Sequence, residues 1–268
     1  MSYALVFGQP RSAFACIAEW REVPAPRGIF LLVHGLNNAP TVMRPFGDLL
    51  NQLGYTTAIV ALTGHRAEER IPSVSRERWR SDIACAAREA GEREPKLPVS
   101  ALGFSLGGAL ALEAMRDLPQ SPFERLVLVA PALGLKGYTV LMRFAAWFDW
   151  TGLAVPSFIP EAYRSGAFTP LTGYGALFEV VDGLLTRPPR APIQTTPTLV
   201  FLNAGDEFIS VSRTQRFVRD ESISTWRIVV LPEEDLATPT HLMLDSATFG
   251  GENWARVTRE ITDFLGGS

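Results

Sequence analysis

The pentapeptide Gly103-Phe104-Ser105-Leu106-Gly107 is the feature that most restricts how this chain can fold. It joins VSAL, an apolar run that predicts a β-strand, to LGGALALEAM, which predicts a helix. A turn this sharp holds its central residue in a strained backbone conformation, and the two glycines remove side chains that would collide where the elements cross. The Ser105 hydroxyl would then stand at a helix N-terminus, where the dipole and free N–H groups favour developing negative charge.

Taken alone, this motif is weak evidence for a nucleophile. A G-x-S-x-G pattern occurs by chance in roughly one chain in ten of this length. The alternative interpretation is a glycine-rich helix start in which Ser105 is only a capping residue. A nucleophilic serine also needs a base that an acid holds in place, so the hypothesis depends on further residues.

Six short apolar runs predict buried parallel strands, because they are apolar on both faces. They are residues 28–33, 56–61, 99–102, 125–130, 198–202 and 226–231. Helical patterns alternate with them at residues 41–53, 77–90, 106–116, 212–218 and 254–265. This alternation predicts an α/β fold, with a mostly parallel central sheet and helices on both faces. We expect two N-terminal segments, 3–7 and 14–20, to form an antiparallel strand pair at one edge.

Residues 133–197 interrupt this alternation and contain 10 of the chain's 27 aromatic residues. A loop of that length without structure is improbable. We therefore expect an inserted cap, mostly helical, over the carboxyl ends of the strands, with residues 1–132 and 198–268 forming the core of a single domain. Trp147, Phe148 and Trp150 are the candidate substrate-binding residues, although the aromatic residues could equally form a small separate core.

Composition limits the possible partners. Twenty-five Lys and Arg against 28 Asp and Glu leave a formal net charge of −3, so there is no basic excess to bind nucleic acid. No segment predicts a membrane span or a signal peptide, and we expect a cytoplasmic location. Cys16 and Cys85 are expected to be buried free thiols. The sequence predicts neither a metal site nor a cofactor.

Five motifs occur in the order HGLNN (34–38), GHR (64–66), GFSLGG (103–108), NAGDEF (203–208) and PTH (239–241). Together they resemble the α/β-hydrolase superfamily along nearly the whole chain, and within it the carboxylesterase and monoacylglycerol lipase branch. Two features depart from related patterns: residues 35–38 lack the HGGG of hormone-sensitive lipases, and Arg66 stands where the branch often has glycine. The resemblance implies an α/β-hydrolase fold.

The superfamily order of nucleophile, acid and base identifies the other candidate catalytic residues. Of the three histidines, His241 alone follows both Ser105 and the penultimate predicted strand, whereas His34 and His65 precede the serine. Asp206 follows a turn glycine after the strand at 198–202 and is the predicted acid, with Glu207 as its competitor. Asp235 is less well placed, since it follows the last strand.

The oxyanion of a tetrahedral intermediate requires two N–H donors. One is expected from Leu106, the residue after the nucleophile, and the other from Leu36, in the loop after the first buried strand. His34 would then brace that loop.

The resemblance implies a serine ester hydrolase (EC 3.1.1) that cleaves a carboxylic ester with an apolar, short-to-medium acyl group through an acyl-enzyme. A thioesterase, C–C bond hydrolase, acyltransferase or small amidase would use the same residues, because fold and triad do not separate these reactions. A third possibility is a non-catalytic ligand-binding protein on the same scaffold.

Overall fold

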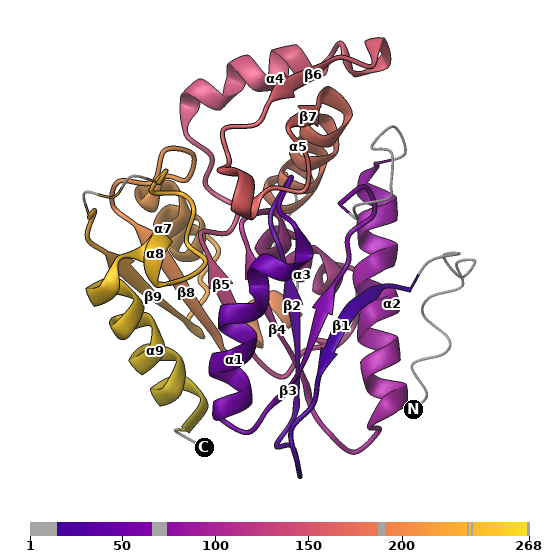
Figure 1. The fold of residues 1–268 in the computed structure, drawn as a ribbon, viewed down its shortest axis with the longest axis vertical. Helices are drawn as coiled ribbons and strands as arrows, with labels where there is room; N and C mark the ends of the chain where they lie inside the picture. The colour runs from indigo at the N-terminus through magenta and orange to yellow at the C-terminus, as the bar shows by residue number, and fades with distance from the viewer. Residues whose placement is uncertain (1–14, 66–73, 187–190, 235, 237, 267–268) are drawn as a thin grey trace.

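The computed structural model describes residues 15–65, 74–186, 191–234, 236 and 238–266. Their centre is a seven-stranded sheet in the order β1-β3-β2-β4-β5-β8-β9 (Figure 1). Its strands are β1 (Ile17–Arg21), β2 (Ile29–Val33), β3 (Thr56–Val60), β4 (Val99–Phe104), β5 (Leu126–Val129), β8 (Thr198–Asn203) and β9 (Trp226–Leu231). All six predicted buried strands are present, and they pair in parallel, which confirms the predicted α/β fold.

The edge strand β1 is the one antiparallel member of this sheet. It pairs with β3, and the partner predicted at residues 3–7 lies outside the described residues. The strand predicted within residues 14–20 is therefore present, and its described partner is β3. β1 covers the hydrogen-bonding edge that β3 would otherwise expose, and an open edge favours aggregation.

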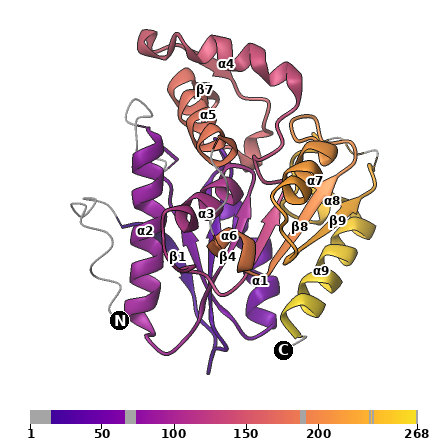
Figure 2. The same ribbon diagram turned by 180° about the vertical axis from the view of Figure 1, so that it is seen from behind.

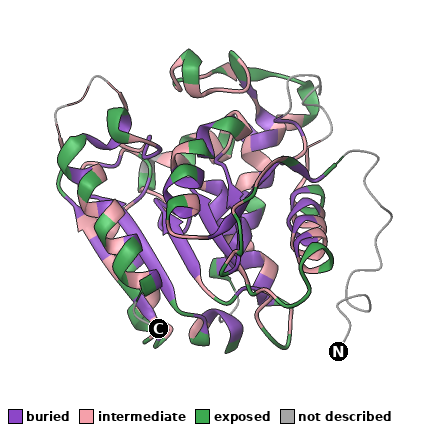
Figure 3. Cartoon of the chain, turned by 60° about the horizontal axis from the view of Figure 1, so that its bottom comes forward, coloured by how far each residue is buried: buried purple, intermediate pink, exposed green. Residues whose placement is uncertain are grey.

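Helices cover both faces of the sheet. Helices α1 (Arg44–Gln52) and α9 (Gly251–Gly266) lie on one face (Figure 1). On the opposite face lie α2 (Arg76–Arg93), α3 (Leu106–Arg116) and α6 (Ala191–Thr195) (Figure 2). Helix α7 (Val211–Asp220) joins β8 to β9, and the short α8 (Ser246–Phe249) precedes α9. Between these layers the strands are buried, whereas the outward faces of the helices are exposed (Figure 3).

Between β5 and α6, the chain forms a separate group of elements above the sheet (Figure 1). It contains α4 (Val140–Ala146), α5 (Leu171–Leu185) and a two-stranded sheet of β6 (Ala154–Pro156) and β7 (Phe168–Pro170). Four short 3-10 turns complete the described set: η2 (Pro40–Met43) before α1, and η4 (Gly137–Thr139), η5 (Asp149–Thr151) and η6 (Glu161–Tyr163) here. The two strands were not predicted, because three residues are too few to display an alternating pattern.

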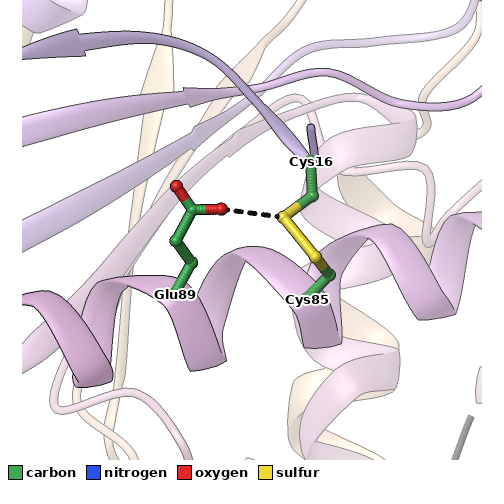
Figure 4. A group of neighbouring side chains, drawn as sticks. All are labelled: Cys16, Cys85 and Glu89. Atoms are coloured by element: carbon green, nitrogen blue, oxygen red, sulfur yellow. Dashed lines mark hydrogen bonds between the residues drawn. A yellow bond between two sulfur atoms is a disulfide. The ribbon is translucent and has the colours of Figure 1, made fainter. Parts of the chain in front are cut away.

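Cys16 and Cys85 form a disulfide, which corrects the expectation of free thiols. The bond joins the residue just before β1 to the middle of α2, with Cα atoms 6.0 Å apart (Figure 4). The Glu89 carboxylate lies 3.3 Å from the Cys16 sulfur. Among the described residues these three form a group with metal-ligand atoms close together, but the disulfide leaves no thiolate to bind an ion.

None of the described helices combines the length and apolarity needed to cross a bilayer.

Reduction of this disulfide should destabilise the protein. A cross-link across 69 positions restricts the unfolded chain and is worth up to about 4 kcal/mol. Urea unfolding with and without a reductant should therefore show a fall of roughly 2–4 kcal/mol in the free energy of unfolding. The double variant Cys16→Ser/Cys85→Ser should have the same free energy of unfolding as the reduced protein. The reductant should not change that value. Two reactive thiols in the denatured, unreduced protein would contradict the cross-link.

Candidate active site

Ser105 lies at the junction of β4 and α3 and has a left-handed backbone conformation, with φ of 50°. Such values are uncommon for residues other than glycine, and they mark strained functional positions. The glycines on either side make the turn possible. A Cβ atom on Gly103 would lie 2.6 Å from the backbone of Gly107, and one on Gly107 would lie 2.2 Å from the carbonyl oxygen of Val33. The first turn of α3 therefore packs against the end of β2 with no room for a side chain.

Ser105, His241 and Asp206 are brought together by three separate loops. His241 Nε2 is 2.9 Å from Ser105 Oγ, and His241 Nδ1 is 2.8 Å from Asp206 Oδ2. A carboxylate only accepts hydrogen bonds, so Nδ1 carries the proton and Nε2 is free to accept the serine hydroxyl. The rings of Phe104 and Phe208 flank the imidazole, with centroids 5.3 and 5.2 Å from its own. This geometry suits a hydroxyl that is activated by an oriented imidazole.

The Asp206 carboxylate is buried but well supplied with donors. Its other oxygen, Oδ1, accepts hydrogen bonds from the N–H groups of Phe208 and Ile209 at 2.7 and 2.8 Å. Burial alone would raise the pKa of this carboxyl. The charge and hydrogen bond of His241, together with the two N–H groups, outweigh that effect and hold the pKa below its ordinary value. The acid therefore stays ionised beside the imidazole.

Glu207, the competing acid, does not contact the imidazole ring. Its carboxylate instead accepts hydrogen bonds from the backbone N–H groups of Thr240 and His241, at 2.8 and 2.7 Å. It thereby fixes the backbone of the loop that carries His241. The other alternative, Asp235, lies outside the described residues.

His34 and His65 are buried side by side, with ring centroids 4.9 Å apart. Burial lowers the pKa of His34 to about 3, assisted by the neighbouring His65 and opposed by a hydrogen bond to the Gly35 carbonyl. Burial likewise lowers the pKa of His65 to about 4, opposed by bonds to the Thr63 and Leu62 carbonyls. Both imidazoles are neutral near pH 7 and serve as hydrogen-bond partners of the surrounding backbone.

These two histidines hold the loop that follows β2. His34 Nδ1 is 2.9 Å from the Gly35 oxygen, and the same oxygen accepts the Asn38 N–H at 3.3 Å. The Gly35 carbonyl and the Leu36 N–H belong to the same planar peptide group. The hydrogen bonds that fix the carbonyl therefore also orient the Leu36 N–H. Within the described residues, neither the Leu36 nor the Leu106 N–H has a hydrogen-bond partner. Two donors are thus available near Ser105, as an oxyanion site requires.

A cavity of about 180 Å³ opens beside Ser105 and His241. Its lining is mostly apolar, and none of the described lining residues is Asp, Glu, Lys or Arg. Aromatic side chains come from several elements: Phe104, Phe158, Tyr174, Phe178 and Phe208. Aliphatic side chains complete the wall: Leu36, Ala132, Leu135, Met142, Ile159, Leu177, Ile209 and Leu242.

Trp147, Phe148 and Trp150, the predicted substrate-binding residues, do not line this cavity. They are exposed, with 73%, 51% and 81% of their surfaces accessible. Helix α4 directs Met142 into the cavity, and the three aromatic residues follow beyond its end, facing outward. Local aromatic density therefore does not show which aromatic residues of this segment face the cavity. Phe158, Tyr174 and Phe178, from the same stretch, and Phe208, next to the predicted acid, form the aromatic wall instead.

Comparison with known proteins places this geometry in context. A sequence model of the family described as serine aminopeptidase, S33, matches residues 24–169. A soluble variant of monoglyceride lipase from Saccharomyces cerevisiae is 13% identical, with a TM-score of 0.71 over 92% of this chain and 89% of that one. Monoacylglycerol lipase from Paleococcus ferrophilus is 16% identical, with a TM-score of 0.72 over 92% and 98% of the two chains.

A third solved structure comes from work on the metagenome-derived lipolytic enzymes LipS and LipT. It is 20% identical, with a TM-score of 0.69 over 91% of this chain and 98% of that one. These similarities confirm the predicted α/β-hydrolase fold. The three structures resembled are those of lipolytic enzymes.

The crowding at Gly107 gives a direct test of the turn. Gly107→Ala would place a Cβ atom 2.2 Å from a backbone oxygen, so the end of β2 or the start of α3 must shift. We expect a loss of at least about 3 kcal/mol in the free energy of unfolding. Gly91→Ala in α2 is the matched control, since its Cβ atom would meet nothing within 4 Å. That change should be neutral or stabilise by about 0.5–1 kcal/mol; equal effects of the two substitutions in urea unfolding would contradict the packing argument.

The two buried histidines predict a loss of stability in mild acid. Their pKa values in the folded state lie near 3 and 4, below the ordinary 6.5, so between pH 6.5 and 4 the unfolded chain takes up protons that the folded protein does not. Each histidine should lower the free energy of unfolding by about 2 kcal/mol between pH 7.5 and 5.

The His65 contribution can be isolated with His65→Gln, which offers an amide oxygen in place of Nε2. Urea unfolding at both pH values should show a smaller pH-dependent loss for the variant than for the wild type. Equal losses would exclude His65 as a source of the pH dependence.

Proposed function

The chain belongs to the serine aminopeptidase S33 family and has the α/β-hydrolase fold, and from this we propose that it is a serine hydrolase of carboxylic esters with apolar acyl groups. The observation that carries the proposal is an uncharged, largely apolar cavity directly beside a hydrogen-bonded Ser105–His241–Asp206 set. A hydrolase is supported by the family and by the lipase and esterase structures that the chain resembles.

In this proposal Ser105 Oγ attacks the ester carbonyl while His241 Nε2 takes the hydroxyl proton. The Leu36 and Leu106 N–H groups stabilise the oxyanion. The protonated His241 then donates to the leaving alkoxide, which leaves an acyl-enzyme on Ser105. A water molecule, activated by His241, hydrolyses that intermediate. Asp206 keeps the imidazole in the required tautomer and stabilises the imidazolium without taking its proton.

The chemistry of the cavity supports a neutral acyl group. An aminopeptidase substrate presents a protonated α-amino group, which needs an acidic partner once it is removed from water. The described lining residues include no carboxylate, and their polar members are hydroxyl, amide or imidazole groups. A cavity of about 180 Å³ favours a short or medium acyl chain. Trp147, Phe148 and Trp150 are not part of this proposed acyl site.

The elements of residues 133–197 supply much of the cavity wall, from Leu135 and Met142 to Leu177 and Phe178. We therefore assign this segment the role of a cap on the core of residues 1–132 and 198–268. The cap excludes water from the acyl group, which strengthens the electrostatic interactions at the reacting carbonyl.

A cytoplasmic location remains a prediction from the sequence. The Cys16–Cys85 disulfide bears on it, because such bonds persist mainly in oxidising compartments. Its redox state in freshly prepared cell extract, trapped by alkylation, would test that prediction.

Loss of the nucleophile provides the central test of the proposed reaction. Ser105→Ala should lower kcat for p-nitrophenyl butyrate by about 10⁴-fold or more. A fluorophosphonate probe should label the wild type at Ser105 and leave the variant unlabelled. Ser246→Ala, at an exposed serine on α8, should behave as wild type in both assays. Equal turnover by Ser105→Ala and wild type would exclude the mechanism.

Substrate class is tested with the same preparation. Butyrate and octanoate esters should be cleaved more efficiently than palmitate esters, and aminoacyl p-nitroanilides should not be cleaved. Labelling of Ser105 without turnover of any ester or thioester would favour a ligand-binding role. Efficient aminoacyl anilide cleavage would contradict the proposed substrate class.

A further inference from the structure

The loop between β6 and β7, residues 157–167, touches both the substrate cavity and the loop after β2. Its first part, from Ser157 to Pro160, lines the cavity. Its second part, residues 163–166, is hydrogen-bonded to residues 37–39, and Asn38 and Arg164 form an isolated β-bridge. The Ser157 N–H donates to the Ala167 oxygen at 2.9 Å, which closes the loop at its base. We call residues 157–167 the hairpin loop.

Asn37 is the centre of this connection. Its side-chain amide pairs with the backbone of Gly166: Nδ2 donates to the Gly166 oxygen at 3.0 Å, and Oδ1 accepts the Gly166 N–H at 3.1 Å. Oδ1 also accepts the Ser165 hydroxyl at 3.0 Å, and the Asn37 carbonyl accepts the Ser165 N–H at 2.8 Å. The residue is 3% exposed, so its amide is held by protein groups.

Asn37 is also fixed from the core side. Its backbone N–H donates to His65 Nε2 at 2.9 Å, and its φ of 56° is left-handed. The Asn38 N–H donates to the Gly35 oxygen and closes a four-residue turn in which Asn37 is the third residue. A positive φ at this position is characteristic of a type II turn. Asparagine tolerates this conformation better than most residues. The neighbour that it positions is Leu36, the proposed oxyanion donor.

We propose that Asn37 is a positioning residue that couples the hairpin loop to the Leu36 oxyanion donor. This inference rests on the proposed esterase function. An acyl chain in the cavity contacts Ser157–Pro160, and the hairpin loop transmits its position through Ser165 and Gly166 to the Asn37 side chain. Occupation of the acyl site therefore favours the loop geometry in which the Leu36 N–H points at the developing oxyanion.

Asn37→Gly isolates the side chain. Glycine adopts positive φ without strain, so the backbone bonds to His65 and Ser165 are retained and only the three side-chain bonds are lost. We expect kcat for p-nitrophenyl butyrate to fall about 10- to 100-fold, which is no more than the fall in kcat caused by loss of a whole oxyanion donor. KM should change by less than about threefold. Asn37→Asp keeps the two acceptor contacts but places a carboxylate oxygen against the Gly166 carbonyl oxygen, so its kcat should also fall below that of the wild type.

Asn51→Gly is the matched control. Asn51 lies in the last turn of α1 and does not line the cavity. Its amide also bridges separate backbone segments, with Nδ2 3.0 Å from the Arg21 oxygen and 2.8 Å from the Tyr55 oxygen. This variant should lose stability but keep the wild-type kcat. A second readout is the ratio of kcat for butyrate to that for acetate esters. The ratio should move toward one in Asn37→Gly and stay at the wild-type value in Asn51→Gly.

The outcomes separate this inference from the proposed function. If the wild type neither cleaves esters nor is labelled at Ser105, the proposed function fails and this inference falls with it. If the wild type does both and Asn37→Gly has an unchanged kcat and acyl-chain ratio, the function stands and the inference is overturned. A fall in kcat of equal size in Asn51→Gly would also overturn it, because general destabilisation would then explain the effect.

Discussion

The close packing of the first turn of α3 against the end of β2 is the constraint on which the rest of the site depends. Gly107 approaches the Val33 carbonyl so closely that no side chain fits, and a side chain on Gly103 would likewise collide with the backbone of Gly107. This packing brings two loops together, the Ser105 turn after β4 and the Gly35–Asn38 turn after β2. The proposed nucleophile after one strand and the proposed oxyanion donor after its neighbour therefore lie side by side because of backbone packing alone.

Fixed backbone geometry also explains why the three histidines have different roles. His241 is partly exposed, and its ring is hydrogen-bonded to both the ionised Asp206 and the Ser105 hydroxyl. His34 and His65 are buried together and neutral, and their ring nitrogens bind backbone groups of the loop after β2. A charged imidazole there would disrupt this loop. The same side chain thus serves as the base of the proposed reaction in one place and as backbone support in the other, according to burial and partners.

Much of this arrangement could be predicted from the sequence, and the failures have physical reasons. Strand–helix alternation predicted the sheet because each buried run is apolar on both faces, and residue order identified His241 and Asp206. The Cys16–Cys85 bond was missed because 69 positions separate the two residues and only the fold brings them together. The exposure of Trp147 and Trp150 could not be predicted, because aromatic content does not reveal which side of a segment faces inward. Asn37 was missed because its importance lies in bonds to Ser165 and Gly166, which leave no local pattern.

The cavity wall and the oxyanion loop are therefore not independent parts. The hairpin loop contributes Ser157–Pro160 to the cavity, and it also contributes the backbone groups that hold Asn37. A cap that only shielded the acyl group from water would need no bonds to the loop after β2. In the proposed reaction, the hydrogen bonds between residues 163–166 and 37–39 would join acyl recognition to the groups that stabilise charge in the transition state. Since only interactions that strengthen in the transition state raise kcat, this connection lets binding of the acyl chain contribute to the chemical step.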